Sequence, residues 1–389
     1  MDLKLINTFA QNKIINQKWH DFITQFELAT MQNGYLPSAT FELTAFCTLK
    51  CPMCYVRIDK ERAEILGGSP CTAKDWIDLA RQFRDQGGIF LLLTGGEAML
   101  RPDFPEIYEE ISRMGLYISL FTNGTTVDEK MLEVLIKRPP AMVGLTIYGA
   151  SEETYRKFGG HKGSFQRAID GLDRLLTIPN LAIDVRFTAC SENYKDFQEV
   201  YELVAKRNKL VSFDFGSCAP VRGASSDARK LRLSKEQIKE VNGVLKEIYK
   251  PVAQVYKKLI GGIGNNNQEE KEISSLETDL QKDRGLWCKG GKNGVYIAWD
   301  GRMYPCDMAS YPYTFPLEQG FKAATQDIQH QIDALLLPER CMSCINKNII
   351  CGCIPKAQNE MKDCARSGNK CGYIPKQELE PEDRELLVV

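Results

Sequence analysis

Three cysteines near residue 50 have the residue type and the spacing of ligands for a metal cluster. Cys47, Cys51 and Cys54, here called the cysteine triad, form a C-x3-C-x2-C run directly after the strand-like segment 40–46. Thiolates bind iron–sulfur clusters, zinc or Cu(I) well, but a structural zinc site usually has four protein ligands. Three thiolates can bind three irons of a four-iron cubane. The triad therefore predicts a [4Fe-4S] cluster with one iron open to another ligand.

The triad resembles the cluster motif of the radical SAM superfamily. In that family the open iron binds the amino and carboxyl groups of S-adenosylmethionine (SAM), and reductive cleavage of SAM yields a 5'-deoxyadenosyl radical. The segment 94–97, Thr-Gly-Gly-Glu, follows the next predicted strand and resembles the family segment that binds the SAM amino group. The resemblance implies these cofactor-binding residues: Met53, Thr94, Gly95, Gly96, Glu97, Thr122, Asn123, Thr146, Arg156 and Arg186.

Some of these assignments have alternatives. Met53 stands where the family usually has an aromatic residue that packs on adenine, and a thioether also packs on rings. Thr146, Arg156 and Arg186 also fit the interpretation of ordinary polar residues at the mouth of a barrel.

The elements that must position these residues alternate between strands and helices. The pattern is typical of parallel βα units, with strands expected at 40–46, 88–94, 116–122, 141–148, 181–189 and 210–217. One helix is expected to begin at Thr72, with Asp75 completing a capping box, and another at Asp103. Six such units form a partial (β/α)6 TIM-like barrel of the α/β class.

The chemistry of such a barrel lies at the carboxyl ends of its strands. Six residues with reactive or contact-forming character stand where the predicted strands end: Cys47, Gly95, Asn123, Tyr148, Cys190 and Cys218. This agreement across six units supports the barrel more strongly than any single motif.

A second set of cysteines follows the barrel. It comprises Cys288, Cys306, Cys341, Cys344, Cys351, Cys353, Cys364 and Cys371. The set resembles the SPASM domain, a C-terminal extension of radical SAM enzymes that carries two auxiliary [4Fe-4S] clusters. A zinc ribbon is the alternative, although the set has no spaced His pair.

The resemblance implies a ligand set for each auxiliary cluster. The outer cluster would be held by Cys341, Cys344, Cys351 and Cys371, and the inner one by Cys288, Cys306 and Cys353. Only Gly352 separates Cys351 from Cys353, which is shorter than the family spacing. The distribution of the last four cysteines between the clusters therefore stays open, with Cys364 as a further ligand or the inner cluster with an open iron.

Five regions are expected along the chain. They are a helical N-terminal lead-in at 1–39, the radical SAM partial barrel at 40–232, a bridging helix and linker at 233–285, a small cysteine-rich SPASM domain at 286–375 and a C-terminal tail at 376–389.

Two residues are candidates for catalysis. Asp307 directly follows Cys306, and an aspartate at this place in sulfatase-maturing relatives is proposed as the base that takes a proton from the substrate. A carboxylate that only binds backbone amides of the cluster loop is the alternative. Cys218 stands at the end of the sixth predicted strand, where a thiol can return a hydrogen atom to a substrate radical; a buried inert cysteine is the alternative.

Composition limits the compartment and the partners. The chain has 50 basic and 51 acidic residues, which gives no reason to expect nucleic acid or an anionic membrane as a partner. The N-terminus lacks the pattern of a signal peptide, and no apolar run reaches the length of a membrane span. We therefore expect a cytoplasmic protein, in which 14 cysteines are metal ligands or catalytic thiols rather than disulfides.

The resemblance implies an enzyme that abstracts hydrogen from a peptide or protein residue and leaves a crosslink, an epimerised centre or an oxidised side chain. A radical SAM dehydrogenase or epimerase acting on a small metabolite is the alternative, and an electron-transfer or cluster-scaffold protein is a third hypothesis. The expected partners are the substrate and a one-electron donor such as a flavodoxin or ferredoxin. Many peptide maturases carry a leader-peptide-binding module before the barrel, and residues 1–39 are too few for it. The expected partners therefore include a separate leader-peptide-binding protein.

Overall fold

The structure is a computed structural model that describes residues 22, 25–26, 29–31, 33–215, 220–260 and 290–333. Its centre is an eight-stranded sheet with the order β6-β5-β4-β3-β2-β1-β7-β8. The strands are β1 (Ser38–Glu42), β2 (Phe90–Thr94), β3 (Tyr117–Thr122), β4 (Met142–Thr146), β5 (Ala182–Ala189), β6 (Val211–Phe215), β7 (Gly294–Ile297) and β8 (Met303–Tyr304). Strands β1 to β6 are all parallel, which confirms the partial barrel.

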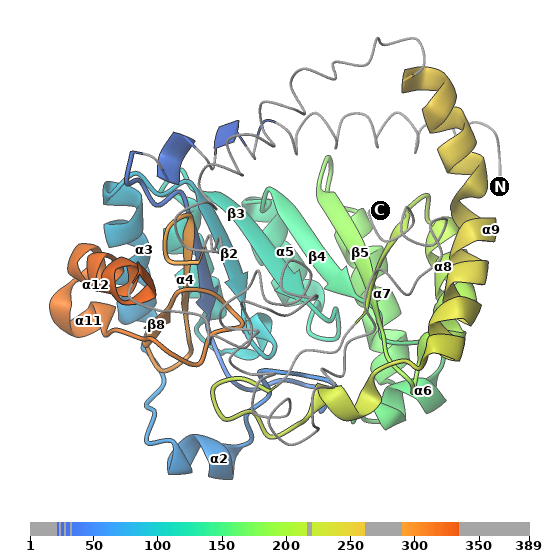
Figure 1. The fold of residues 1–389 in the computed structure, drawn as a ribbon, viewed down its shortest axis with the longest axis horizontal. Helices are drawn as coiled ribbons and strands as arrows, with labels where there is room; N and C mark the ends of the chain where they lie inside the picture. Colours follow the sequence, from blue (N-terminus) through green and yellow to red (C-terminus); the bar gives the residue numbers. More distant parts are fainter. Residues whose placement is uncertain are drawn as a thin grey trace, which may run out of the picture.

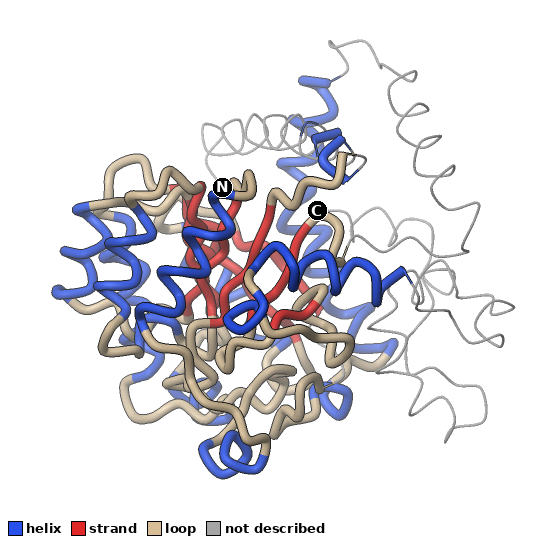
Figure 2. Tube along the Cα trace, turned by 90° about the vertical axis from the view of Figure 1, so that its left-hand side faces the viewer, coloured by secondary structure: helices blue, strands red, loops and turns tan. Residues whose placement is uncertain are grey.

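Helices connect the parallel strands and cover the outside of the sheet (Figures 1 and 2). They are α2 (Lys60–Ile65), α3 (Ala73–Asp85), α4 (Phe104–Ser112), α5 (Glu129–Lys137), α6 (Glu152–Lys157), α7 (Ser164–Leu176), α8 (Phe197–Ala205) and α9 (Lys235–Ile260). Two more helices, α11 (Pro316–Gln319) and α12 (Phe321–Asp333), lie beside α3 (Figure 1). Short 3-10 turns lie at Ala98–Leu100, Tyr194–Asp196 and Ala228–Leu231.

The two expected helix starts have different local chemistry. At α3 the capping box forms, because the Thr72 side chain accepts from the Asp75 N–H and the Asp75 carboxylate accepts from the Thr72 N–H. At α4, Asp103 makes no capping bond. Its carboxylate instead accepts two bonds from the Arg101 guanidinium, at 2.8 and 2.7 Å. The second helix therefore begins where predicted but without the predicted cap.

The first strand is shorter than the sequence pattern predicts. It ends at Glu42, whereas the apolar run continues to residue 46. Beyond Glu42 the backbone turns across the loop that follows β2, and the Thr44 carbonyl accepts from the Gly96 N–H at 2.8 Å. The triad is therefore separated from β1 by a four-residue segment, 43–46, that packs on the next βα loop.

Residues 290–333 add strands that the sequence analysis did not anticipate. β7 pairs in parallel with β1, with Ser38 opposite Gly294 and Phe41 opposite Ile297, and β8 pairs antiparallel with β7. The Phe321 ring at the start of α12 packs on Phe83 of α3, with ring centroids 5.7 Å apart. The segment that carries Cys306 is thus fixed directly to the barrel.

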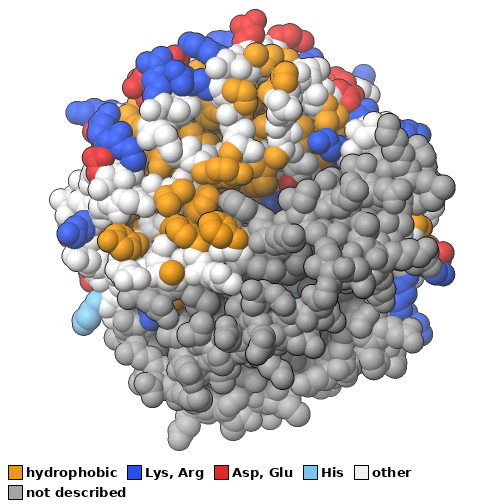
Figure 3. Space-filling view, turned by 90° about the horizontal axis from the view of Figure 1, so that it is seen from above, with side chains coloured by type: hydrophobic (Ala, Val, Ile, Leu, Met, Phe, Trp, Pro, Cys, Tyr) orange, Lys and Arg blue, Asp and Glu red, His pale blue; other side chains and the backbone are white. Residues whose placement is uncertain are grey.

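The two edges of the sheet have different surroundings. Loops gather at the lower edge in Figure 2, where the parallel strands end. Near the opposite edge, Tyr35, Ile89 and Tyr117 are exposed, and the view from above shows hydrophobic side chains gathered on that side (Figure 3). Within the described ranges, no helix has the length and apolar character to cross a membrane.

Candidate active site

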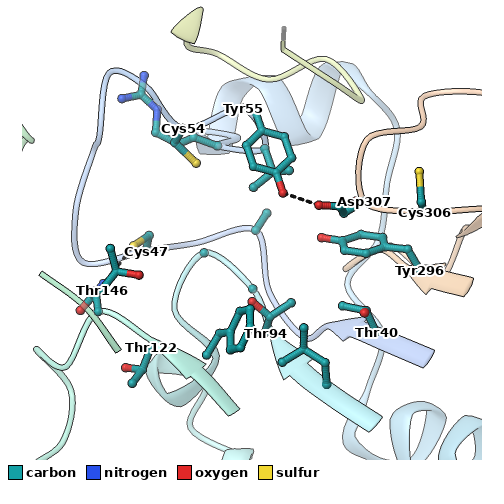
Figure 4. Close-up of a pocket in the computed structure, with 18 of the residues that line it drawn as sticks. Thr40, Cys47, Cys54, Tyr55, Thr94, Thr122, Thr146, Tyr296, Cys306 and Asp307 are labelled. Atoms are coloured by element: carbon teal, nitrogen blue, oxygen red, sulfur yellow. Dashed lines mark hydrogen bonds between the residues drawn. The ribbon is translucent and has the colours of Figure 1, made fainter. Parts of the chain in front are cut away.

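A cavity of about 500 Å³ lies at the carboxyl edge of the parallel strands. The three triad cysteines line it together with Gly95, Thr122, Thr146 and Tyr148, which follow or end β2, β3 and β4. The strand arrangement therefore brings together residues that are up to a hundred positions apart in the sequence. Figure 4 shows this cavity, with Cys47 and Cys54 on one side and Cys306 and Asp307 on the other.

The triad thiols are largely removed from water. Cys51 is 6% exposed, and Cys47 and Cys54 are half-buried. Burial raises the pKa of the Cys47 thiol to about 12 and raises the pKa values of Cys51 and Cys54 as well. The thiolate forms therefore need a positive partner, and metal binding displaces thiol protons in this way.

The geometry of the triad suits a cluster with several metal atoms. Among the described residues, no three His, Cys, Asp or Glu side chains converge on one metal ion. In a cubane each thiolate binds a different iron, so the three sulfurs need not meet at one point. One buried and two half-buried thiols on one cavity wall, with the Asn123 amide nitrogen 3.4 Å from the Cys47 sulfur, fit a [4Fe-4S] cluster.

The two glycines after β2 are required by close packing within the chain. A Cβ on Gly95 would lie 2.8 Å from the Thr44 carbonyl oxygen, and one on Gly96 would overlap the Phe46 carbonyl. The Gly96 and Glu97 N–H groups donate to the Thr44 and Phe46 carbonyls, both at 2.8 Å. Both glycines also line the cavity. They thus let the β2 loop support the segment that leads into the triad.

Glu97 is 1% exposed, and its carboxylate binds the loop that follows β3. One oxygen accepts from the Thr122 hydroxyl and the other from the Asn123 N–H, both at 2.9 Å. Burial raises the pKa of this carboxyl, and these hydrogen bonds oppose the rise. Glu97 is not among the residues that line the cavity. Its contacts position Asn123 beside the triad.

Asn123 connects the third βα loop to the triad. Its amide N–H group donates to the Thr48 hydroxyl at 3.1 Å and to Cys47 at 3.4 Å. Its carbonyl accepts from the Thr125 N–H and hydroxyl, at 3.0 and 2.6 Å. The sequence analysis selected Asn123 for a cofactor contact. In the structure its side chain bonds the triad segment, and its backbone N–H bonds Glu97.

The remaining cofactor candidates differ in where they lie. Thr94 and Thr146 line the cavity. Met53 is 6% exposed and packs with Tyr155 and Phe158 in a hydrophobic cluster. Arg156 is exposed on α6.

Arg186 is not among the residues that line the cavity, but it contacts one of them, Phe121. Its guanidinium pairs with Asp184 at 2.6 Å and lies 4.2 Å from the Phe121 ring centroid. Neither Arg186 nor Arg156 or Met53 belongs to the described lining.

Tyr55 directly follows the triad residue Cys54, and its side chain bonds an aspartate on the opposite side of the cavity (Figure 4). The Tyr55 hydroxyl donates to the Asp307 carboxylate at 2.7 Å, and Cys306 lines the cavity beside Asp307 (Figure 4). Burial, followed by the charge of Asp307, raises the pKa of Tyr55 well above its usual range. Tyr55 therefore stays protonated as the donor, and sequence reasoning had missed it because its partner is 252 positions away.

A buried pair of oppositely charged side chains lies next to Asp307. Arg222 and Glu42 are 4.0 Å apart, with side chains 6% and 2% exposed. Arg222 also donates to the Asp307 carbonyl at 2.5 Å and the Ala309 carbonyl at 3.1 Å. Its guanidinium lies 4.5 Å from the Tyr296 ring centroid. The pair was not foreseen, although a lone acid within an apolar strand was a visible signal.

The cysteines other than the triad are only partly described. Cys306 lies in the described part of the chain and is half-buried. The other candidates lie outside the described residues, and their assignments stay predictions: Cys218, Cys288, Cys341, Cys344, Cys351, Cys353, Cys364 and Cys371. Cys190 is fully buried in the hydrophobic cluster that contains Cys51.

Curated proteins with related sequences cover most of the chain. An AdoMet-dependent heme synthase from Methanosarcina barkeri is 26% identical over 86% of this chain and 96% of its own length. A PqqA peptide cyclase from Rhizobium meliloti is 25% identical over 86% of each chain. The sporulation killing factor maturation protein SkfB from Bacillus subtilis is 27% identical over 74% of this chain and 64% of its own.

Solved structures share the fold. SuiB from Streptococcus suis, bound to S-adenosylmethionine, superposes with a TM-score of 0.56 and 15% identity over 82% of this chain and 72% of SuiB. The enzyme anSMEcpe with bound AdoMet gives a TM-score of 0.54 and 17% identity over 80% of this chain and 87% of its own. Residues 41–204 match the family model described as the Radical SAM superfamily. Over these residues the chain is similar to the radical SAM superfamily, and this similarity implies a [4Fe-4S] cluster and SAM as cofactors.

Proposed function

We propose that this protein is a SPASM-type radical SAM enzyme that modifies a residue of a peptide or protein. The observation that carries the proposal is one cavity with the triad and Tyr55 on one wall and Cys306 and Asp307 on the other, joined by the Tyr55–Asp307 hydrogen bond. The arrangement suits a substrate that is activated near the triad and then loses a proton on the facing wall.

Names of related proteins support the peptide class. Relatives include a PqqA peptide cyclase and the maturation protein SkfB. Among similar solved structures, one holds SuiB bound to the precursor peptide SuiA and another anSMEcpe with a Cp18Cys peptide. We extend to this chain the substrate class that these proteins share.

In this proposal the triad would hold the SAM-binding cluster, whose electron cleaves SAM to the radical that abstracts hydrogen. The chain's own groups then have separate tasks. Asn123 donates to Cys47 and fixes the triad loop. The Tyr55 hydroxyl occupies Oδ2 of Asp307, which leaves Oδ1 to accept a proton from the substrate. Glu97 and Thr122 hold the loop that carries Asn123.

The proposal includes two auxiliary clusters beyond the barrel. Cys306 would share the inner cluster with Cys288 and Cys353. The outer cluster would be held by Cys341, Cys344, Cys351 and Cys371. Cys306 lines the cavity, so a cluster bound there would adjoin the substrate. A cluster at that place would be able to accept an electron from the substrate or to bind a substrate thiolate.

The test uses anaerobically reconstituted protein, SAM, a chemical reductant and peptides encoded by small reading frames beside the gene. We expect 5'-deoxyadenosine to form and one peptide to change in mass. Deuterium placed on the modified carbon should appear in the 5'-deoxyadenosine. SAM cleavage without any peptide change across all such candidates would contradict the peptide assignment.

A second candidate is an enzyme that acts on a small metabolite. The relation to an AdoMet-dependent heme synthase, which covers 96% of that relative, favours it. Substrate-dependent 5'-deoxyadenosine formation with a small molecule, and none with peptides, would select this alternative. The cofactor chemistry and the triad would be the same in both.

A further inference from the structure

Asn123 is a buried residue whose side-chain amide contacts the triad. It is 5% exposed and directly follows β3, and its backbone N–H donates to the Glu97 carboxylate at 2.9 Å. The sequence analysis assigned this residue to a contact with SAM. The hydrogen bonds of its side chain lead to a different assignment, because they determine which groups the amide can still offer to a ligand.

A backbone group fixes the orientation of the amide. The Thr125 N–H donates to Oδ1 of Asn123 at 3.0 Å, and an N–H group can only donate. The amide oxygen therefore faces Thr125, and the amide nitrogen faces the triad segment. A flipped amide would place its own N–H against the Thr125 N–H.

A closed ring of hydrogen bonds uses one hydrogen of the amide nitrogen. The Thr125 hydroxyl donates to the Asn123 oxygen at 2.6 Å. A hydroxyl has one hydrogen, so the Thr125 oxygen accepts from the Thr48 hydroxyl, which lies 2.7 Å away. The Thr48 hydroxyl in turn accepts from Nδ2 of Asn123 at 3.1 Å. Each hydroxyl in the ring both accepts and donates, and bonds linked in this way strengthen one another.

The second hydrogen of the amide nitrogen has the Cys47 sulfur as its acceptor, at a nitrogen–sulfur distance of 3.4 Å. A side-chain amide has two donor hydrogens and two acceptor lone pairs, and the bonds above use all four within the chain. None is left for SAM. The Cys47 sulfur also accepts from the Leu49 N–H at 3.4 Å, so two N–H groups donate to one triad sulfur.

Donors to a cluster sulfur affect how easily the cluster is reduced. Reduction adds negative charge, and an N–H donor stabilises the more negative state more strongly. Hydrogen bonds to the sulfurs are therefore among the features that set the reduction potential of an iron–sulfur cluster. Cys47 is half-buried, and limited access of water strengthens such a bond.

We propose that Asn123 is a positioning residue that acts through the Cys47 sulfur and raises the reduction potential of the cluster bound to the triad, rather than a residue that binds SAM. The ring with Thr48 and Thr125 holds its amide in the orientation that donates to sulfur. This inference rests on the assignment of a [4Fe-4S] cluster to the triad within the proposed function, and it is independent of the substrate class.

The test is a redox titration of the anaerobically reconstituted full-length protein without SAM, followed by electron paramagnetic resonance (EPR). The triad signal is the one that is absent from the Cys47→Ala, Cys51→Ala, Cys54→Ala triple variant. In Asn123→Leu and, independently, Asn123→Ser, we expect the ratio of reduced to oxidised cluster at a fixed potential to fall about tenfold, which is a shift of about 59 mV to more negative potential for one electron. Leucine has no donor, and the serine side chain is too short to keep the contact.

Thr48→Val is the matched control. It removes a hydroxyl of the ring but keeps the Thr125 N–H that orients Asn123, so its midpoint potential should equal that of the wild type. The iron content of the three variants should also equal that of the wild type. Loss of iron from both Asn123 variants would give Asn123 a structural role alone and overturn the proposal.

A spectroscopic signature detects the hydrogen bond itself. In protein labelled with the heavy nitrogen isotope at asparagine side chains, pulsed EPR of the triad signal should show a coupling to the labelled nitrogen that is missing in Asn123→Leu. The absence of this coupling from the wild type would overturn the proposal. An unchanged midpoint potential in both Asn123 variants, or an equal shift in Thr48→Val, would do the same.

Two further outcomes are decisive. A higher Kd for SAM in Asn123→Leu, with an unchanged potential, would make Asn123 a SAM contact and overturn the proposal. The absence of any triad-dependent signal would refute the cluster assignment and this inference together. An unshifted potential with that signal present refutes this inference alone, so the two failures are distinguishable.

Discussion

The buried pair behind the active site leads to a prediction about stability and pH. Glu42 is 2% exposed, and burial raises its pKa from 4.5 to about 7, despite the opposing charge of Arg222 and a hydrogen bond with Tyr296. Glu42→Gln keeps a neutral side chain of similar shape at every pH. The substitution removes the titration and also leaves Arg222 without its acidic partner, so the informative quantity is how the stability difference changes with pH.

The sign follows from proton binding. Between pH 4.5 and about 7 the folded chain holds a proton on Glu42 that the unfolded chain has released, so this contribution to stability is complete below pH 4.5 and is lost as the pH rises through about 7. One pKa unit corresponds to about 1.4 kcal/mol. From pH 5 to 8, the free energy of unfolding of the wild type should fall by roughly 2–3 kcal/mol relative to Glu42→Gln.

The assay is urea denaturation of wild type, Glu42→Gln and a control, Glu133→Gln, at pH 5, 6, 7 and 8. Glu133 is exposed on α5, so its substitution should leave the pH profile of the wild type unchanged. From pH 5 to 8 the wild type should lose stability relative to Glu42→Gln by the amount given above. Parallel curves would refute the claim that burial raises the pKa of Glu42 despite the charge of Arg222.

Two further predictions address the cavity walls. Tyr55→Phe removes the 2.7 Å bond to Asp307 and should lower product formation roughly ten- to a hundredfold while 5'-deoxyadenosine still forms. Chromatography of modified product and 5'-deoxyadenosine measures both. Equal losses of the two would contradict a role of Tyr55 that acts through Asp307 alone. Gly96→Ala places a methyl group against the Phe46 carbonyl and should cost about 1–3 kcal/mol in thermal unfolding, whereas Gly243→Ala in α9, with open space around it, should not destabilise.

The sequence predicted the barrel because its signals are local and repeated. The capping box at Thr72 and Asp75 depends on residues three positions apart, and the parallel strands carry apolar residues either in a run, as in β2, or alternating with polar ones, as in β6. The triad follows from spacing within eight residues. Such features are decided by short stretches of chain, and the structure places them together at the carboxyl edge of the strands.

Features that depend on distant partners were not predictable in the same way. β7 has four residues and becomes a strand because Ser38 and its neighbours offer an unpaired edge 256 positions earlier. Tyr55 gains its role from Asp307, and Arg222 from Glu42. Glu97 was identified by its motif, but its two hydrogen bonds to residues 122 and 123 depend on the packing of adjacent βα loops.

The central claim is that the cysteine triad supports reductive cleavage of SAM. The most direct measurement is 5'-deoxyadenosine formation by anaerobically reconstituted protein with SAM and a reductant, alongside the Cys47→Ala, Cys51→Ala, Cys54→Ala triple variant. We predict product from the wild type, none from the variant, and a loss of about four irons in the variant, as one [4Fe-4S] cluster requires. Equal product from both proteins, or equal iron content, would contradict the account.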